Sequence, residues 1–279
     1  MARDSYANSE VLDFYKALPF NQKSSLEEEI AVIRNRTPQD LYPGLARLLS
    51  PKASVLEVGS GVGWLSNSIN FLYKSPVLGI DFNPVAVGFA QEVAKRMGLR
   101  TRFEVQDLFV FEPSEPFDVV LSFGVLHHTD NCGAAVARLC EKFVKPGGQV
   151  MIGLYHKYGR RPFLDYFDEM KKSGATQEQM VTRYRTMMPY LKDETHLLSW
   201  FRDQVMHPHE TQHTLKEILP ILESSGMEFI STSINHFQPF RSLSKLLARE
   251  EEYEVIARDN LKNNKYFPGF FIFIAKKKV

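Results

Sequence analysis

Three glycines in one short turn are the residues of this chain best suited to binding a small ligand. Residues 55–64 read Val-Leu-Glu-Val-Gly-Ser-Gly-Val-Gly-Trp, an apolar run with Glu57 followed by Gly59, Gly61 and Gly63. Glycine allows unusual backbone angles and a close approach of the ligand, and a following helix offers free N–H groups. The turn indicates a nucleotide-like ligand without saying which one.

Acidic residues follow two other apolar runs, at positions suited to the rest of such a ligand. Asp81 ends the run 77–81, and Gln106-Asp107 ends the run that starts at residue 102. Open parallel sheets bind ligands at the carboxyl ends of their strands. There, Asp81 can accept hydrogen bonds from both ribose hydroxyls, and Gln106-Asp107 can accept one from the exocyclic amine of adenine. The structural alternatives are a helix cap for Asp81 and a plain loop acid for Asp107.

Strands and helices alternate along the chain from about residue 53, which is the mark of an α/β fold with a parallel sheet covered on both faces. Asn83-Pro84 is typical of a helix N-cap followed by a first-turn proline. We expect strands at residues 54–58, 77–81, 102–106, 117–122, 149–154, 228–234 and 269–275, and helices near residues 63–73, 84–97, 132–144, 161–172, 177–190 and 214–223.

The segments outside this alternation predict four parts of the chain. Residues 1–45 form an N-terminal helical cap, and residues 46–154 form the ligand-binding core. Residues 155–212, rich in Tyr, Phe, Met and His, form a helical and aromatic lid. Residues 213–279 complete the core, with a further cover insertion at 236–267.

The totals favour a cytoplasmic protein without a nucleic-acid partner. Its 279 residues include 34 basic and 33 acidic side chains, a net charge of +1 that gives no electrostatic footprint for a phosphate backbone. The only two cysteines, Cys132 and Cys140, are eight apart on an expected helix and are not expected to pair, which fits a reducing compartment. Neither a signal peptide nor an apolar run of membrane-spanning length is visible.

Five motifs in order resemble those of class I S-adenosylmethionine-dependent methyltransferases. They read VLEVGSGVGWLS, LGIDFNP, FEVQDLF, FDVVLSFGVLHHTDN and FVKPGGQVMIGLY, and they cover residues 50–155. The resemblance implies a Rossmann-like, seven-stranded, mostly parallel sheet whose last strand is antiparallel, with a helical cover. It also implies S-adenosyl-L-methionine as the cofactor.

The resemblance further implies roles for individual residues. The glycine turn with Ser60 would wrap the amino-acid portion and ribose of the cofactor, and Glu57 would lie beneath its amino group. Asp81 would bind the ribose. The remaining contacts implied are Phe82, Gln106, Asp107 and Leu108 at the adenine, Phe123 and His128 near the reacting methyl group, and Tyr15 over the carboxylate.

Two competing motif readings are weaker. A nicotinamide-binding turn would carry glycine where Trp64 stands. The string His207-Pro-His209-Glu-Thr-Gln-His213 contains the His-Glu-x-x-His zinc-protease pattern, which works only on a helix. A capping box at Thr214 starts the helix after this string, so we predict a loop and no metal.

Histidines and tyrosines near the expected ligand face are the candidates for a catalytic base. Methyl transfer mainly requires positioning, and a base helps when the nucleophile carries a proton. We rank His209 and His156 first, followed by His128 and Tyr155. Arg160 and Arg161 are candidates for holding a substrate carboxylate or phosphate.

The sequence therefore predicts an S-adenosylmethionine-dependent methyltransferase that methylates a small molecule by direct displacement, as in secondary metabolism. A methyltransferase acting on tRNA or protein is an alternative, although Ser122-Phe123-Gly124-Val125 stands where nucleobase amino-methyltransferases carry Asn/Asp-Pro-Pro-Tyr/Phe. A protein that binds the cofactor without catalysis is another. A homodimer is compatible with the sequence, and no membrane partner is expected.

Overall fold

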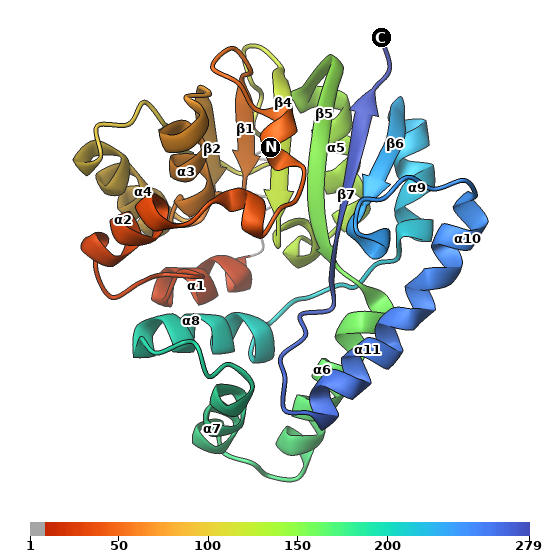
Figure 1. Ribbon diagram of the computed structural model, residues 1–279. Helices are drawn as coiled ribbons and strands as arrows, with labels where there is room; N and C mark the ends of the chain where they lie inside the picture. The colour runs from red at the N-terminus through yellow and green to blue at the C-terminus, as the bar shows by residue number, and fades with distance from the viewer. Residues whose placement is uncertain (1–8) are drawn as a thin grey trace, which may run out of the picture.

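The computed structural model describes residues 9–279 and contains one seven-stranded sheet (Figure 1). The strand order is β3-β2-β1-β4-β5-β7-β6. The first five strands are parallel, and β7 runs antiparallel to both of its neighbours. This confirms the predicted Rossmann-like sheet. The strands span Val55–Val58 (β1), Val77–Asp81 (β2), Arg102–Val105 (β3), Phe117–Phe123 (β4), Val144–Tyr155 (β5), Met227–Thr232 (β6) and Phe270–Lys277 (β7).

Two hydrophobic clusters cover the two faces of the sheet. On β1, Leu56 and Val58 belong to the cluster that includes side chains of α5 and α9, whereas Val55 belongs to the one with Leu65 and Ile69 of α3. Strands buried on both faces read as continuous apolar runs, which is why the central strands were visible in the sequence. The flanking helices are α3 (Trp64–Tyr73), α4 (Pro84–Arg96), α5 (Cys132–Arg138) and α9 (Leu215–Ser224).

The predicted helix 132–144 is divided in the structure. It ends as an α-helix at Arg138 and continues as one π-helical turn, Leu139–Phe143. The cysteines on this segment, Cys132 and Cys140, are buried and unpaired among the described residues, as expected from their spacing.

The N-terminal segment lies across one end of the sheet. Helix α1 (Ser9–Ala17) sits below the carboxyl ends of the strands in Figure 1, and α2 (Leu26–Asn35) packs on α3 and α4. Short 3₁₀ turns at Pro38–Asp40 and Leu45–Leu48 lead into β1. The first eight residues of the predicted cap lie outside the described range.

Two insertions, the predicted lid and the predicted cover insertion, pack together, and we refer to them jointly as the lid. Helices α6 (Lys157–Lys172), α7 (Gln177–Met187) and α8 (Glu194–Val205) lie between β5 and α9, and α10 (Leu243–Ala248) and α11 (Glu252–Lys262) lie between β6 and β7. Helix α11 packs along α6 (Figure 1). Helices α8, α10 and α11 were not among the helices predicted from the sequence, and the N-cap of α8 is Asp193.

None of the helices within residues 9–279 combines the length and apolarity needed to cross a bilayer.

Candidate active site

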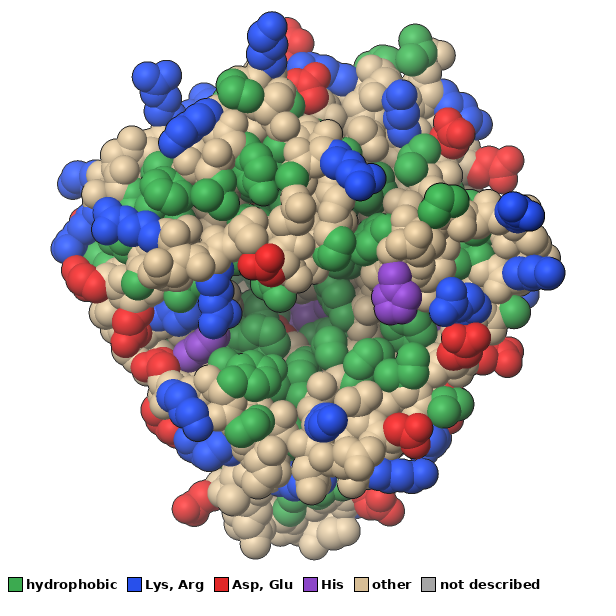
Figure 2. Space-filling model, viewed as in Figure 1, with side chains coloured by type: hydrophobic (Ala, Val, Ile, Leu, Met, Phe, Trp, Pro, Cys, Tyr) green, Lys and Arg blue, Asp and Glu red, His purple; other side chains and the backbone are tan. Residues whose placement is uncertain are grey.

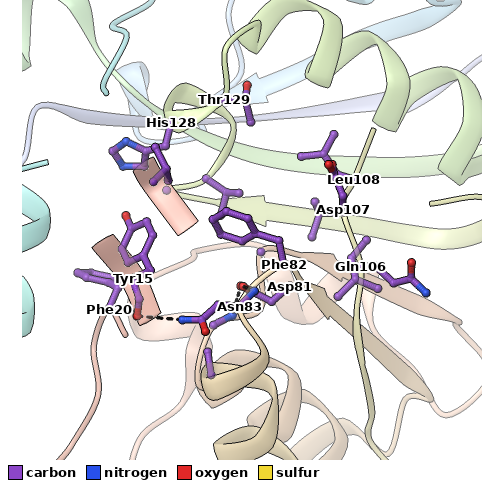
Figure 3. A pocket seen from close by; sticks show the side chains of 18 of the residues that line it. Tyr15, Phe20, Asp81, Phe82, Asn83, Gln106, Asp107, Leu108, His128 and Thr129 are labelled. Atoms are coloured by element: carbon purple, nitrogen blue, oxygen red, sulfur yellow. Dashed lines mark hydrogen bonds between the residues drawn. The ribbon is translucent and has the colours of Figure 1, made fainter. Parts of the chain in front are cut away.

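A cavity opens where the carboxyl ends of β1, β2 and β4 meet the N-terminal cap. Figure 2 shows this face hollowed at its centre, with hydrophobic and histidine side chains inside the hollow. In Figure 3, Tyr15, Phe20 and His128 lie at one end of the pocket and Gln106, Asp107 and Leu108 at the other, with Phe82 between them. The lining residues are Val11, Tyr15, Pro19, Phe20, Val58, Gly59, Gly61, Ile80, Asp81, Phe82, Asn83, Ala86, Gln106, Asp107, Leu108, Phe109, Phe123, Gly124, Val125, His128 and Thr129.

The glycine turn forms one wall of the cavity and is tied to the end of β2. Gly59 and Gly61 have φ of 75° and 51°, which glycine adopts without strain. A Cβ on Gly59 would lie 2.2 Å from a methyl group of Val125, whereas a Cβ on Gly61 would meet no atom within 4 Å. Gly59 is therefore required by packing, and the space beside Gly61 is open to a ligand.

Asp81 connects three parts of this wall. Its Oδ2 accepts a hydrogen bond from Gly61 N (2.8 Å) and its Oδ1 accepts one from Asn83 N (2.9 Å). Asn83 caps α4 as predicted and donates from Nδ2 to the carbonyl of Tyr15 (2.9 Å; Figure 3). Burial raises the pKa of Asp81, partly offset by these backbone N–H groups. The carboxylate thus links the turn, the helix start and the cap.

Asp107 presents an unused acceptor at the opposite end of the cavity. Its Oδ1 accepts a hydrogen bond from Phe109 N (2.9 Å), and its Oδ2 is buried without a partner among the described residues. Buried polar atoms are normally hydrogen-bonded, so an orphan acceptor on a cavity wall marks a position for a ligand donor. Gln106 and Leu108 flank it on the same wall.

The cap and the lid close the cavity at the end that holds Tyr15. Tyr15 Oη donates to Oδ1 of Asp203 on α8 (2.5 Å), and the Phe20 ring packs on Trp200 with 5.0 Å between centroids. Burial, followed by the charge of Asp203, raises the pKa of Tyr15, which keeps its proton. Helices α1 and α8, distant in sequence, therefore meet at the cavity.

Several residues predicted for cofactor binding do not line this cavity. Glu57 accepts a hydrogen bond from Ser66 Oγ on α3 (2.5 Å), and burial raises its pKa to about 8. Ser60 is buried within the turn, its hydroxyl has no partner among residues 9–279, and Gly63 forms the N-cap position of α3. Their predicted contacts with the cofactor stay predictions.

The histidines ranked first as bases lie away from the cavity. His156 is fully buried at the start of α6, where its Nδ1 accepts from Gly159 N (3.4 Å) and its Nε2 donates to Glu250 (3.0 Å). His209 donates from Nε2 to the carbonyl of Thr129 (3.1 Å). The sequence predicts that both histidines lie near the carboxyl ends of the strands. It does not reveal that the His156 ring caps α6 and bonds Glu250, or that the His209 ring bonds Thr129.

Tyr155 and the two arginines are also engaged elsewhere. Tyr155 is buried, and its hydroxyl pairs with Gln204. Arg160 is fully buried and bonds both carboxylate oxygens of Glu210 (3.0 and 2.7 Å), while the exposed Arg161 pairs with Asp165. Within residues 9–279 no Lys or Arg lines the cavity, so the expectation that these arginines hold an anionic substrate is not supported.

His128 belongs to a cluster with Asp203 and His207 that was not predicted from the sequence. Asp203 and His207 join His128 in the one group of potential metal ligands within the described range, with one candidate atom each within 4.8 Å of the others. The fit to a metal is poor, because His207 Nδ1 accepts a hydrogen bond from His209 N (3.1 Å), which leaves the proton of the neutral ring on Nε2. We derive no metal chemistry from this group.

The comparisons with known proteins agree with this geometry. The family model described as "Methyltransferase domain" matches residues 49–203. Phosphoethanolamine N-methyltransferase 3 of Arabidopsis thaliana is 31% identical over 184 residues, 66% of this chain and 36% of that protein, so the chain spans about a third of that relative's length. Ubiquinone biosynthesis O-methyltransferase of Rhodopseudomonas palustris is 27% identical over 176 residues, 63% of this chain and 61% of that protein.

Solved structures show the same fold. Magnesium protoporphyrin IX methyltransferase from Synechocystis PCC 6803, solved with bound SAH, has a TM-score of 0.53 at 17% identity and covers 98% of this chain and 95% of its own. PKMT2 from Rickettsia typhi, in complex with AdoHcy, has a TM-score of 0.58 at 14% identity, over 97% of this chain and 53% of its own. With the matched family covering more than half of its length, the chain belongs to the class I S-adenosylmethionine-dependent methyltransferases.

Proposed function

We propose that this protein transfers the methyl group of S-adenosylmethionine to a small-molecule acceptor in a single displacement. The observation that carries the proposal is one covered cavity in which strand-end loops present acceptors for an adenosyl group at one end and a histidine at the other. Cover by α1 and α8 favours an acceptor small enough to be enclosed. The names of the two curated relatives likewise describe transfer to small molecules.

The residues fit the cofactor at two independent points. The unpartnered Oδ2 of Asp107 suits the exocyclic amine of adenine, with Leu108 and Phe82 beside the ring. The open space at Gly61 suits a ligand that approaches the backbone closely. Between them, Asp81 would accept the ribose hydroxyls while keeping its bonds to the turn, since each carboxylate oxygen has two acceptor sites.

This arrangement would place the reacting methyl group beside Phe123 and His128. When bound, S-adenosylmethionine supplies an electrophilic methyl group on a sulfonium centre. The protein contributes position and the exclusion of water, which together account for most of the acceleration expected of an in-line displacement. Tyr15 and Phe20 would close over the bound pair, so cap movement precedes and follows each turnover.

The test is the affinity for S-adenosylhomocysteine, measured by isothermal titration calorimetry. Asp107→Ala should weaken binding about tenfold, the effect of losing one hydrogen bond, without unfolding the protein. Asp81→Asn should weaken it about as much or more. Asp168→Asn on the exposed surface of α6 is the matched control. Unchanged affinity in both cavity variants would refute the assignment, and no binding by the native protein would refute the function.

A further inference from the structure

Two histidine side chains beside the proposed methyl position carry buried nitrogen atoms that bind nothing. The rings of His128 and His207 stack with centroids 3.7 Å apart, and the Nε2 of each is buried without a partner among the described residues. A buried donor or acceptor left unpaired costs about 1–3 kcal/mol. The His128 ring lines the cavity and the His207 ring is stacked behind it, so a polar group of the substrate that reaches past His128 would complete both atoms.

The backbone of His209 fixes which of the two nitrogens carries a proton. Its carbonyl accepts from Nδ1 of His128 (2.9 Å), and its N–H donates to Nδ1 of His207 (3.1 Å). In a neutral imidazole one nitrogen donates and the other accepts. The Nε2 of His128 is therefore a free acceptor, and the Nε2 of His207 is a free donor.

Both rings are neutral under physiological conditions. Burial lowers the pKa of His128 to about 4 and that of His207 to about 3. The groups around them are His127, His209, Glu210 and Arg160, with Asp203 beside His207. The donor–acceptor pair thus keeps its polarity near neutral pH.

We propose that this pair grips the hydroxyl group of a phenolic acceptor, and that the enzyme is an O-methyltransferase in which His207 is a catalytic residue. The inference rests on the function proposed above. A hydroxyl oxygen can donate its proton to His128, accept from His207 with one lone pair and attack with the other. A neutral amine has one lone pair, so accepting from His207 would occupy the pair that must attack.

The step balances without a further reagent. The oxygen lone pair forms the new O–CH₃ bond while the S–CH₃ bond breaks, and its electron pair stays on sulfur. The hydroxyl proton passes to Nε2 of His128 as the oxygen becomes positive, and it leaves to solvent when the cap opens. A weak base suffices because the O–H group becomes strongly acidic as the bond forms, and a phenol begins with a pKa near 10.

The charges around the cavity support an uncharged acceptor. Its lining residues in the described part of the chain include no Lys or Arg, and the nearby Arg160 is paired with Glu210 and hydrogen-bonded to Gln204. A phosphate group on the acceptor would find no lining cation to neutralise its charge. The apolar wall of Val11, Pro19 and Phe20 suits a hydrocarbon or aromatic body.

Access follows from the position of the cap. The Phe14 and Tyr15 rings lie 5.1 and 5.3 Å from the His207 ring, so the pair is closed to water in this state. The acceptor would enter when α1 shifts and would be sealed in when it returns.

The deciding experiment identifies the methylated atom directly. The protein is incubated with S-adenosylmethionine carrying a carbon-13 methyl group and with para-ethylphenol, para-ethylaniline, phenylethanol or phosphoethanolamine, or with a small-molecule extract of its source. Carbon-13 NMR then distinguishes methoxy from methylamine products. We expect methoxy products from phenols and none from phosphoethanolamine. Preferred methylation of nitrogen, or no O-methylation while S-adenosylhomocysteine still binds, would overturn this inference alone, whereas absence of that binding would overturn the proposed function.

A series of variants distinguishes loss of the His207 hydrogen bond to the substrate from loss of the fold. His207→Phe keeps an aromatic ring without the donor and should lower kcat about 100-fold, with S-adenosylhomocysteine affinity within about twofold of the native value. His207→Gln, which retains an N–H donor, should recover part of the rate. The exposed His236→Asn is the control. Unchanged kcat in His207→Phe would contradict the proposal. Activity that is lost with a chelator and restored by Zn²⁺ would also contradict it, because the histidines would then be metal ligands.

Discussion

Gly59 and Gly61 have different roles in the glycine turn, although the sequence motif does not distinguish them. The Cβ position of Gly59 is filled by Val125, and the Cβ position of Gly61 is open. Both have positive φ, where a non-glycine residue costs about 1–2 kcal/mol. One glycine therefore serves the packing of the fold, and the other serves the space proposed for the cofactor.

We predict that alanine mainly lowers stability at Gly59 and mainly weakens cofactor binding at Gly61. Gly59→Ala should lower the free energy of unfolding by about 2–4 kcal/mol, because overpacking adds to backbone strain. Gly61→Ala should cost about 1 kcal/mol but weaken S-adenosylhomocysteine binding more than tenfold. Urea denaturation and calorimetric titration of both variants measure the two effects. Equal losses of stability, or intact binding in Gly61→Ala, would contradict the separation.

The positions of residues at the cavity were predictable where strand order alone determines them. Asp81 and Asp107 follow β2 and β3, so their placement at the cavity follows from the topology. Asp203 and His207 are about 75 residues from His128 in sequence and meet it only because α8 returns to the cap. The His-Glu-x-x-His string begins at His209, whose backbone contacts the two rings while its side chain bonds Thr129.

At the scale of elements, the cap helix α2 carries a buried acid without hydrogen bonds. Glu29 is fully buried, neither carboxylate oxygen has a partner among the described residues, and Lys23 Nζ lies 4.0 Å away. Burial raises the pKa of Glu29 to about 7, while Lys23 opposes the shift. The folded protein thus holds a proton that the unfolded chain has released.

The sign of the pH dependence follows from this difference. Because the folded pKa exceeds the unfolded value of 4.5, folding binds a proton between the two values, and stability falls as pH rises through this window. Between pH 5 and pH 8 we predict that the free energy of unfolding falls by about 3 kcal/mol less in Glu29→Gln than in the native protein. Urea denaturation at both pH values measures it, with the exposed Glu28→Gln as the control. Parallel curves for native protein and Glu29→Gln would refute the assignment.

Element boundaries were predictable to within a few residues where packing is regular. Strand β2 was located at its observed ends because both faces of it are buried. Helix α8 was missed because its apolar residues face a lid core shared with Leu261 and Tyr266, from a different insertion. Local periodicity cannot reveal a partner surface that lies about 60 residues further along the chain.

At the scale of the whole molecule, one buried cation joins the lid to the sheet. Arg160 at the start of α6 bonds Glu210 in the loop before α9 and both Gln204 oxygens on α8, and it stacks 4.1 Å from the ring of Tyr155 on β5. Burial opposes the charge of Arg160, but its neighbours, first Tyr155 and then Glu210, outweigh that effect and raise the pKa of the guanidinium, so Arg160 stays charged. The junction therefore links α6, α8 and the loop before α9 to strand β5.

Replacing Arg160 alone should destabilise the protein more than replacing both Arg160 and Glu210. Arg160→Met leaves Glu210 buried and uncompensated, and we expect a loss of about 3–5 kcal/mol in the free energy of unfolding. Adding Glu210→Met should restore much of that loss, because two apolar side chains of similar volume replace the buried pair. Urea denaturation measures both variants, and Arg161→Met on the exposed face of α6 is the control. If the double variant is as unstable as Arg160→Met, the junction is held by packing and not by its charges.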